Sequence, residues 1–269
     1  MSVNWGLSKF GENLCVGSGI GELMDDLGEA LAAGGDVKML GGGQPAHIPE
    51  IDAVWRHRMQ EIMTEPGGLE KMIGNYDVPA GSDLFRKALA KLFQKEFGWQ
   101  VTHENFAVTM GGQTAFFFLF NALAGKFGDG SRKKILLPLV PEYIGYANQS
   151  VDSDFFEAIP AHIEKTGPHE FKYKVNFDAV NPGDDIAAIC VSRPTNPSGN
   201  VLTDDEIERL RKIAREKGIP LIIDNAYGAP FPNVIFSEVI PVWDEGMILT
   251  LSLSKNALLG IYIDTNTSL

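Results

Sequence analysis

The sequence predicts an α/β fold in which a mostly parallel β-sheet lies between two layers of helices. Near-continuous apolar runs, such as 186–191 and 221–223, alternate with segments whose apolar residues recur at helical spacing. Strands that are apolar on both faces are typical of parallel sheets covered on both sides. The chain has 269 residues, 44% of them hydrophobic, so it can bury a core of this size.

Helices and glycine turns are expected in the first hundred residues. We predict helices at 22–33 and 51–64, and a third that begins after Ser82 and ends at Gly98. A short apolar run and a glycine turn at 37–45 separate the first two. The third helix has the clearest pattern, with an apolar face made of Phe85, Leu89, Leu92, Phe93 and Phe97.

Strands and helices then alternate, as a parallel sheet requires. One helix is expected at 114–124. Another begins with a capping box formed by Thr203 and Glu206 and ends at Gly218. The predicted strands are 106–109, 134–137, 186–191, 221–224 and 248–255.

The composition excludes several classes of function. The net charge of −12 disfavours binding to nucleic acid or to anionic lipid, and the five histidines show no metal-ligand spacing. We expect the two cysteines to be reduced thiols. The sequence shows neither a secretion signal nor a membrane-spanning stretch. We therefore expect a cytoplasmic protein that binds no metal.

Polar groups follow four of the predicted strands, where ligands of open parallel sheets bind. Asp224 and Lys255 each end an apolar run. A carboxylate beside a pyridine nitrogen and a lysine amine are the groups that pyridoxal phosphate requires. Taken alone, each could be the solvated end of a strand. The same strand ends also offer Tyr227, Asn196 in the turn 192–199, Ser252 and Ser254, and a glycine turn with Gly112 and Gln113 that can hold a phosphate.

With these residues the chain resembles the fold-type I pyridoxal-phosphate aminotransferases. The turn 196–199 is similar to the Asn-Pro-Thr-Gly signature of that family, 224–227 to its Asp-x-x-Tyr and 252–255 to its lysine box. The resemblance runs from about residue 14 to 255. The sequences of 41–46 and 141–146 resemble those of family members that act on small aliphatic amino acids. It implies ping-pong transfer of an amino group between valine or alanine and a 2-oxo acid, pyruvate or 2-oxoisovalerate.

The resemblance also implies roles for individual residues. Lys255 would bind the cofactor's aldehyde covalently and move the proton at the substrate's α carbon, while Asp224 would keep the pyridine nitrogen protonated. Asn196 and Tyr227 would bind the ring's phenolic oxygen, and Tyr143 would stack on the ring. The structural alternatives are a surface lysine, a helix cap at Asp224, turn-shaping residues and a core aromatic at Tyr143.

The remaining implied roles concern the phosphate, the substrate and a second subunit. Gly112, Gln113, Ser252 and Ser254 would hold the phosphate, and Gly43 would contact the substrate. Tyr76 would reach the phosphate in the neighbouring subunit, which implies a homodimer with shared active sites. Its alternative is an ordinary turn tyrosine.

The resemblance ends after Lys255. Relatives place a phosphate-binding arginine there and continue into a C-terminal small domain, whereas 261–263 contains no arginine and the sequence ends at Leu269. We therefore expect an N-terminal segment 1–48, an incomplete cofactor-binding large domain 49–255 and a divergent tail 256–269. The sheet would lose a strand and the parts that should cover it, which would expose an edge and an apolar face.

We expect the chain to be truncated, to lack the small domain and not to be a competent transaminase by itself. Two alternatives stay open. A pyridoxal-phosphate lyase of the same fold would use the same Lys255 and Asp224 but eliminate a leaving group. A catalytically dead remnant would use neither.

Overall fold

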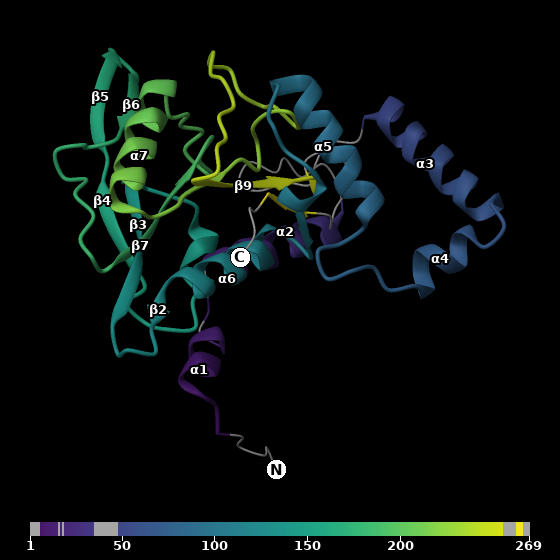
Figure 1. The fold of residues 1–269 in the computed structure, drawn as a ribbon, viewed down its shortest axis with the longest axis horizontal. Helices are drawn as coiled ribbons and strands as arrows, with labels where there is room; N and C mark the ends of the chain where they lie inside the picture. The colour runs from purple at the N-terminus through teal and green to yellow at the C-terminus, as the bar shows by residue number, and fades with distance from the viewer. Residues whose placement is uncertain (1–5, 16, 18, 35–47, 255–261, 266–269) are drawn as a thin grey trace.

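The structure is a computed structural model, which describes residues 6–15, 17, 19–34, 48–254 and 262–265. An eight-stranded sheet forms its centre, and helices lie against the sheet on both faces (Figure 1). The predicted α/β class is confirmed.

The middle of the sheet is parallel. Strands β3 (Arg132–Val140), β7 (Ile186–Ser192), β8 (Leu221–Asp224) and β9 (Met247–Ser252) pair in that order, and β4 (Phe156–Pro160) pairs in parallel with β3 on its other side. All residues of β7, β8 and β9 are buried, as their apolar sequences predict. The carboxyl ends of these strands therefore lie along one edge of the sheet.

Antiparallel strands complete the sheet on both sides. β2 (Gly125–Lys126) pairs with β3, and β10 (Tyr262–Thr265) lies between β9 and β1 (Ala107–Thr109), antiparallel to both. The backbone of 262–265 therefore occupies the place beside β9, so β9 is not an edge strand of this sheet. An extended segment can fill a sheet position in either direction, since both ladders use the same backbone groups.

The two helical layers bury opposite sides of the same strands. Helices α5 (Asp83–Phe97) and α7 (Asp204–Lys217) pack on one face, and α6 (Gly112–Leu123) packs on the other. Successive side chains of a strand point to opposite faces, so Leu221 lies in the α5 and α7 core and Ile222 in the α6 core. The expected three layers are present.

Helix ends follow the predicted signals with one exception. The Thr203 hydroxyl accepts the Glu206 N–H at 3.2 Å, and the Glu206 carboxylate accepts the Thr203 N–H at 2.9 Å, which forms the capping box. Gly218 and Gly98 end α7 and α5 at φ of 65° and 69°. Ser82 stands at the start of α5, but its side chain makes no capping hydrogen bond, contrary to the prediction.

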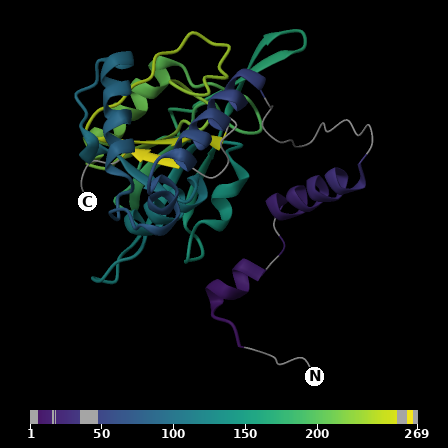
Figure 2. The ribbon, with the colours of Figure 1, turned by 90° about the vertical axis from the view of Figure 1, so that its right-hand side faces the viewer.

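The N-terminal helices are α1 (Lys9–Cys15), α2 (Gly19–Ala33), α3 (Pro49–Thr64) and α4 (Gly68–Gly74). Helices α3 and α4 project at the right of the layered body in Figure 1, α1 projects below it, and Figure 2 shows α1 standing away from the body. The predictions at 22–33 and 51–64 are confirmed. In the described part of the chain, no helix has the length and apolar character needed to cross a membrane.

Several short elements have no clear sequence signal. Strands β5 (His162–Gly167) and β6 (Glu170–Lys174) form a separate hairpin, and almost all of β5 is exposed, so its sequence lacks apolar alternation. The 3₁₀ helices η1 (His103–Asn105) and η2 (Ile144–Asn148) are too short for periodicity to reveal.

Candidate functional site

The predicted site residues follow neighbouring strands of the parallel sheet. Asp224 is the last residue of β8, with Ser192 of β7 opposite it on one side and Thr250 of β9 opposite it on the other. Asn196 and Tyr227 lie in the loops after β7 and β8. The carboxyl edge of the sheet thus gathers residues that the sequence places up to 58 positions apart, from Ser192 to Thr250.

Asp224 is a buried carboxylate, 8% exposed. Its Oδ2 accepts the Tyr146 hydroxyl at 2.9 Å and its Oδ1 accepts the Ala226 N–H at 3.0 Å. Burial raises the pKa of Asp224, while these hydrogen bonds oppose the rise. No cation among the described residues pairs with it. A buried carboxylate in this situation suits a cationic ligand group such as a protonated pyridine nitrogen.

Tyr143 is held against the start of α6. The Gln113 amide nitrogen donates to the Tyr143 hydroxyl at 3.2 Å, and the Tyr143 ring meets the Tyr146 ring edge-on, with 5.4 Å between centroids. A Cβ at Gly145 would clash with the Gln113 amide nitrogen and the Tyr143 ring where they now lie, so glycine permits this arrangement. The Gln113 Oε1 is buried and has no hydrogen-bond donor within the described residues. These features fit a bound ligand beside Tyr143.

Asn196 and Tyr227 meet across the site. The Asn196 amide nitrogen donates to the Tyr227 hydroxyl at 3.3 Å, although the two residues lie on different loops. This confirms that the structure brings them together, which a shared ligand oxygen would require. Their role in binding that oxygen stays a prediction.

The predicted phosphate residues lie at the beginning of α6 and the end of β9. Gly112 and Gln113 form the first turn of α6, and the first N–H groups of a helix lack partners within it. Gly111 precedes them with φ of 123°, which favours glycine. Ser252 and Ser254 are buried, and the Ser252 hydroxyl accepts the Ser254 N–H at 3.2 Å. Helix α6 contacts β9, so the two groups belong to adjacent elements.

The remaining predicted site residues are Tyr76, Lys255 and Gly43. Tyr76 is fully exposed beyond α4. Lys255 and Gly43 lie outside the described residues. Their roles therefore stay predictions.

The structure adds Glu142, Ser192 and Tyr146, which sequence reasoning missed as site residues. The Glu142 carboxylate accepts the Ser192 N–H at 2.8 Å, the Ser192 hydroxyl at 2.7 Å and the Tyr143 N–H at 2.9 Å. Burial raises the pKa of Glu142 to about 7, and the hydrogen bonds from Ser192 oppose that rise. Glu142 follows the last residue of β3 by two positions, and this was the available signal, because polar residues near strand ends identified the other site residues.

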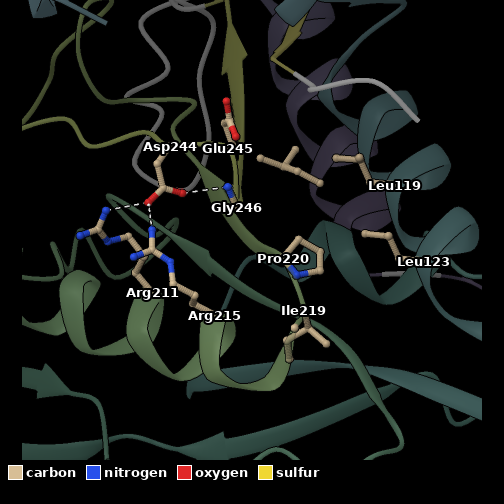
Figure 3. Close-up of a pocket in the computed structure, with 11 residues that line it drawn as sticks. Leu119, Leu123, Arg211, Arg215, Ile219, Pro220, Asp244, Glu245 and Gly246 are labelled. Atoms are coloured by element: carbon tan, nitrogen blue, oxygen red, sulfur yellow. Dashed lines mark hydrogen bonds and ion pairs between the residues drawn. The ribbon is translucent and has the colours of Figure 1, made fainter. Parts of the chain in front are cut away.

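A cleft of about 390 Å³ lies at the opposite edge of the sheet (Figure 3). Residues 219–220 and 244–246, which precede β8 and β9, line it together with α6 and α7. Three of its charged side chains pair with one another, since the Asp244 carboxylate accepts Arg211 at 2.6 Å and Arg215 at 2.8 Å, as well as the Gly246 N–H at 2.8 Å. The predicted site therefore does not coincide with this cleft.

Comparison with known proteins supports the interpretation of the carboxyl edge. Residues 46–260 match the family model described as aminotransferase class I and II. The valine–pyruvate aminotransferase of Escherichia coli K12 is 45% identical over 253 residues, which cover 94% of this chain and 60% of the relative.

Two solved structures are also similar to this chain. A putative amino-acid aminotransferase from Psychrobacter arcticum 273-4 matches this chain with a TM-score of 0.89 and 42% identity. The match covers 98% of this chain and 65% of the Psychrobacter chain. The valine-pyruvate aminotransferase of Salmonella typhimurium LT2 matches this chain with a TM-score of 0.79 and 43% identity. The match covers 93% of this chain and 61% of the Salmonella chain. The chain thus spans less than two thirds of the length of each of these relatives.

Proposed function

Because the chain belongs to the aminotransferase class I and II family, we propose that the protein uses pyridoxal phosphate to transfer an amino group between a small aliphatic amino acid and a 2-oxo acid. Valine or alanine is the proposed donor, and pyruvate or 2-oxoisovalerate the acceptor. The 45% identity to a valine–pyruvate aminotransferase supports this substrate pair. The observation that carries the proposal is the buried Asp224 carboxylate, which lacks a cation among the described residues and lies at the carboxyl edge of the sheet.

The bound cofactor supplies an aldehyde that binds amines and a ring that accepts the electrons left when the α proton departs. Lys255 would hold the aldehyde and then carry the α proton, since a neutral amine can act as a base. Asp224 would hold the ring nitrogen in its cationic form through a charge-assisted hydrogen bond. Asn196 and Tyr227 would bind the ring's phenolic oxygen. Tyr143 would cover one face of the ring.

The phosphate would bind where backbone N–H groups are available. Gly112 and Gln113 would offer the N–H groups of the first turn of α6, where the helix dipole also favours an anion. Ser252 and Ser254 would donate their hydroxyls from the end of β9. Gly43 would lie beside the substrate.

We also propose a homodimer in which each subunit completes the other's site. Tyr76 is fully exposed, so within one subunit its ring is free to enter a neighbour. Helices α3 and α4 expose several large apolar side chains nearby, which a second subunit would cover. These side chains are Val54, Met59, Met63, Met72 and Ile73.

The transfer reaction is tested with pyridoxal phosphate, pyruvate and valine labelled with ¹⁵N. Two proteins are compared: the 269-residue chain, and a chimaera of residues 1–260 with the part of the E. coli relative that lies beyond its match. We expect the chimaera to form ¹⁵N-alanine and 2-oxoisovalerate in equal amounts. Borohydride reduction and peptide mapping should find the cofactor on Lys255. Release of labelled ammonia would favour a lyase, and a cofactor on another lysine would contradict the assignment.

The shared site is tested by mixing two variants of the chimaera. Tyr76→Phe should weaken cofactor binding about 10- to 100-fold, because one hydrogen bond to a charged phosphate is worth roughly 1.5–3 kcal/mol. In a mixed dimer with Lys255→Ala, the intact Lys255 site receives its Tyr76 from the Lys255→Ala subunit. Its cofactor affinity should then return to the wild-type value. Affinity that stays weak in the mixed dimer would show that Tyr76 acts within its own subunit or not at all.

A further inference from the structure

Four side chains form one continuous hydrogen-bond chain beneath the site: Glu142, Ser192, Tyr146 and Asp224. The distances between successive oxygens are 2.7 Å from Glu142 to Ser192, 2.8 Å from Ser192 to Tyr146 and 2.9 Å from Tyr146 to Asp224. Each lies within the range of an O–H···O hydrogen bond. Ser192 and Tyr146 are each 2% exposed, so water does not reach the middle of this hydrogen-bond chain.

The hydrogen-bond chain has three gaps but only two hydroxyl hydrogens. Each gap requires one hydrogen, and serine and tyrosine supply one each. If both carboxyls were ionised, Ser192 would donate to Glu142 and Tyr146 would donate to Asp224. The Ser192 and Tyr146 oxygens would then face each other at 2.8 Å with only lone pairs between them. Any other arrangement of the two hydrogens moves the empty gap without filling it.

We propose that the hydrogen-bond chain holds one extra proton, carried by Glu142 or by Asp224, and that this proton sets which of the two carboxyls is charged. When Glu142 is neutral, it donates to Ser192, Ser192 donates to Tyr146, and Tyr146 donates to a charged Asp224. When Asp224 is neutral, all three hydrogen bonds reverse. The two forms differ by the shift of three hydrogens and by no exchange with solvent.

The electrostatics of the site favour a single negative charge. Two ionised carboxyls in one buried hydrogen-bond chain repel each other and are poorly solvated. Burial raises the pKa of both, and the charge of Asp224 adds to the rise at Glu142. The buried Cys190 thiol on β7 has its pKa raised by burial and then by both carboxyls, so it does not supply a second charge. The Tyr146 phenol likewise has its pKa raised, first by burial.

No positive group in the described part of the chain compensates either carboxyl. Arg193 follows Ser192, but its guanidinium donates to the backbone oxygens of Leu202 and Ile240 and binds the Asp204 carboxylate. The Glu142 carboxylate also accepts the backbone N–H of Tyr143, which carries no charge. The balance between the two carboxyls is therefore open to a cation that arrives with a ligand.

The hydrogen-bond chain would respond to a cationic ring nitrogen at Asp224. A positive charge there draws the negative charge to Asp224 and sends the proton to Glu142. The site would acquire its charge by internal transfer, without releasing a proton to water. Glu142 is thus a positioning residue that acts through Asp224. This last step rests on the proposed function, whereas the shared proton does not.

The shared proton is tested on the cofactor-free 269-residue chain labelled with ¹³C at the glutamate carboxyls. The Glu142 signal is identified as the one missing from Glu142→Gln. We expect Glu142 to titrate near pH 7 rather than near the ordinary glutamate pKa of roughly 4.3. Adding pyridoxal phosphate at pH 7 should move the signal towards the neutral carboxyl. The Asp224 signal is identified in the same way, from Asp224→Asn in protein labelled at the aspartate carboxyls. If the Glu142 and Asp224 signals are both fully ionised from about one unit above their ordinary pKa values upward, the proposal is overturned.

Two variants break the hydrogen-bond chain at different points. Tyr146→Phe keeps the ring, which packs 4.8 Å from the Phe116 centroid, but removes the hydroxyl between Ser192 and Asp224. One hydroxyl hydrogen then suffices for the one remaining gap. Glu142 should therefore titrate at lower pH and no longer respond to the cofactor. Ser192→Ala removes the other hydroxyl and should likewise abolish the response to the cofactor. The matched control Tyr173→Phe lies on β6, and its Glu142 signal should titrate as in the wild type.

A second measurement follows the pH dependence of unfolding. The folded chain keeps a proton that the unfolded chain releases above the ordinary glutamate pKa, so the unfolding free energy should fall as pH rises from about 4.5 towards 7. The slope should correspond to up to one extra proton, and Glu142→Gln should remove that contribution while the exposed control Glu170→Gln retains it. If the unfolding free energies of Glu142→Gln and of the wild type showed the same pH slope, the shared proton would be excluded. Absence of cofactor binding by the chimaera, together with a Glu142 signal that titrates near pH 7, would contradict the proposed function alone.

Discussion

Replacing Lys255 by alanine is expected to lower the amino-group transfer of the chimaera by at least about 10²- to 10⁴-fold, the usual contribution of a positioned acid or base. The physical reason is that the α proton then has no amine to receive it. Loss of the covalent link to the aldehyde should lower turnover further. The measurement is the rate of 2-oxo acid release after rapid mixing with valine.

The matched variant for this prediction is Lys255→Arg. Arginine keeps the positive charge, but its guanidinium stays protonated and cannot act as a base. We expect it to be nearly as slow as Lys255→Ala, which separates the need for a base from the need for a charge. Turnover within about tenfold of the wild type in either variant would refute the role of Lys255, because a tenfold change is only roughly 1.4 kcal/mol.

Replacing Asp224 by asparagine is expected to lower turnover by about 10²- to 10³-fold, as removal of a buried electrostatic stabiliser does in other enzymes. Asparagine is neutral, so it cannot hold the ring nitrogen in its cationic form, and the ring becomes a weaker acceptor of electrons. Its amide would also meet the Tyr146 hydroxyl, which now donates to Asp224 at 2.9 Å. Some cofactor should still bind, because the phosphate residues lie on α6 and β9.

The control for Asp224 is the conservative variant Asp224→Glu. It keeps the carboxylate but moves it by one methylene, so we expect a smaller loss of turnover than in Asp224→Asn. Cofactor affinity is measured in parallel by titration, which separates weak binding from slow reaction. Near-normal turnover of saturated Asp224→Asn would show that the ring nitrogen does not depend on this carboxylate.

The sequence predicted those parts of the fold that depend on local patterns. The apolar run before Asp224 became the buried strand β8, and the Thr203 and Glu206 capping box began α7 where predicted. Both signals act over a few residues, so neighbours in the sequence suffice to reveal them. The β5 and β6 hairpin was missed because its exposed strands carry no such signal.

The direction of the last strand could not be predicted from its sequence. Residues 262–265 pair antiparallel with both β1 and β9, whereas the sequence indicated only a divergent tail at 256–269. Four residues contain too few side chains to specify a partner. The choice depends on which sheet position the rest of the fold leaves available.

The sequence by itself determined which chemical groups follow the strands: the Asp224 carboxylate, the Asn196 amide and the Tyr227 phenol. Only the tertiary structure decided that Glu142, separated from Ser192 by 50 residues, joins Asp224 through a buried hydrogen-bond chain. Strand ends are encoded locally by backbone propensity and apolar pattern. Contacts between strands depend on register and burial, and these also set the pKa values of the two carboxyls.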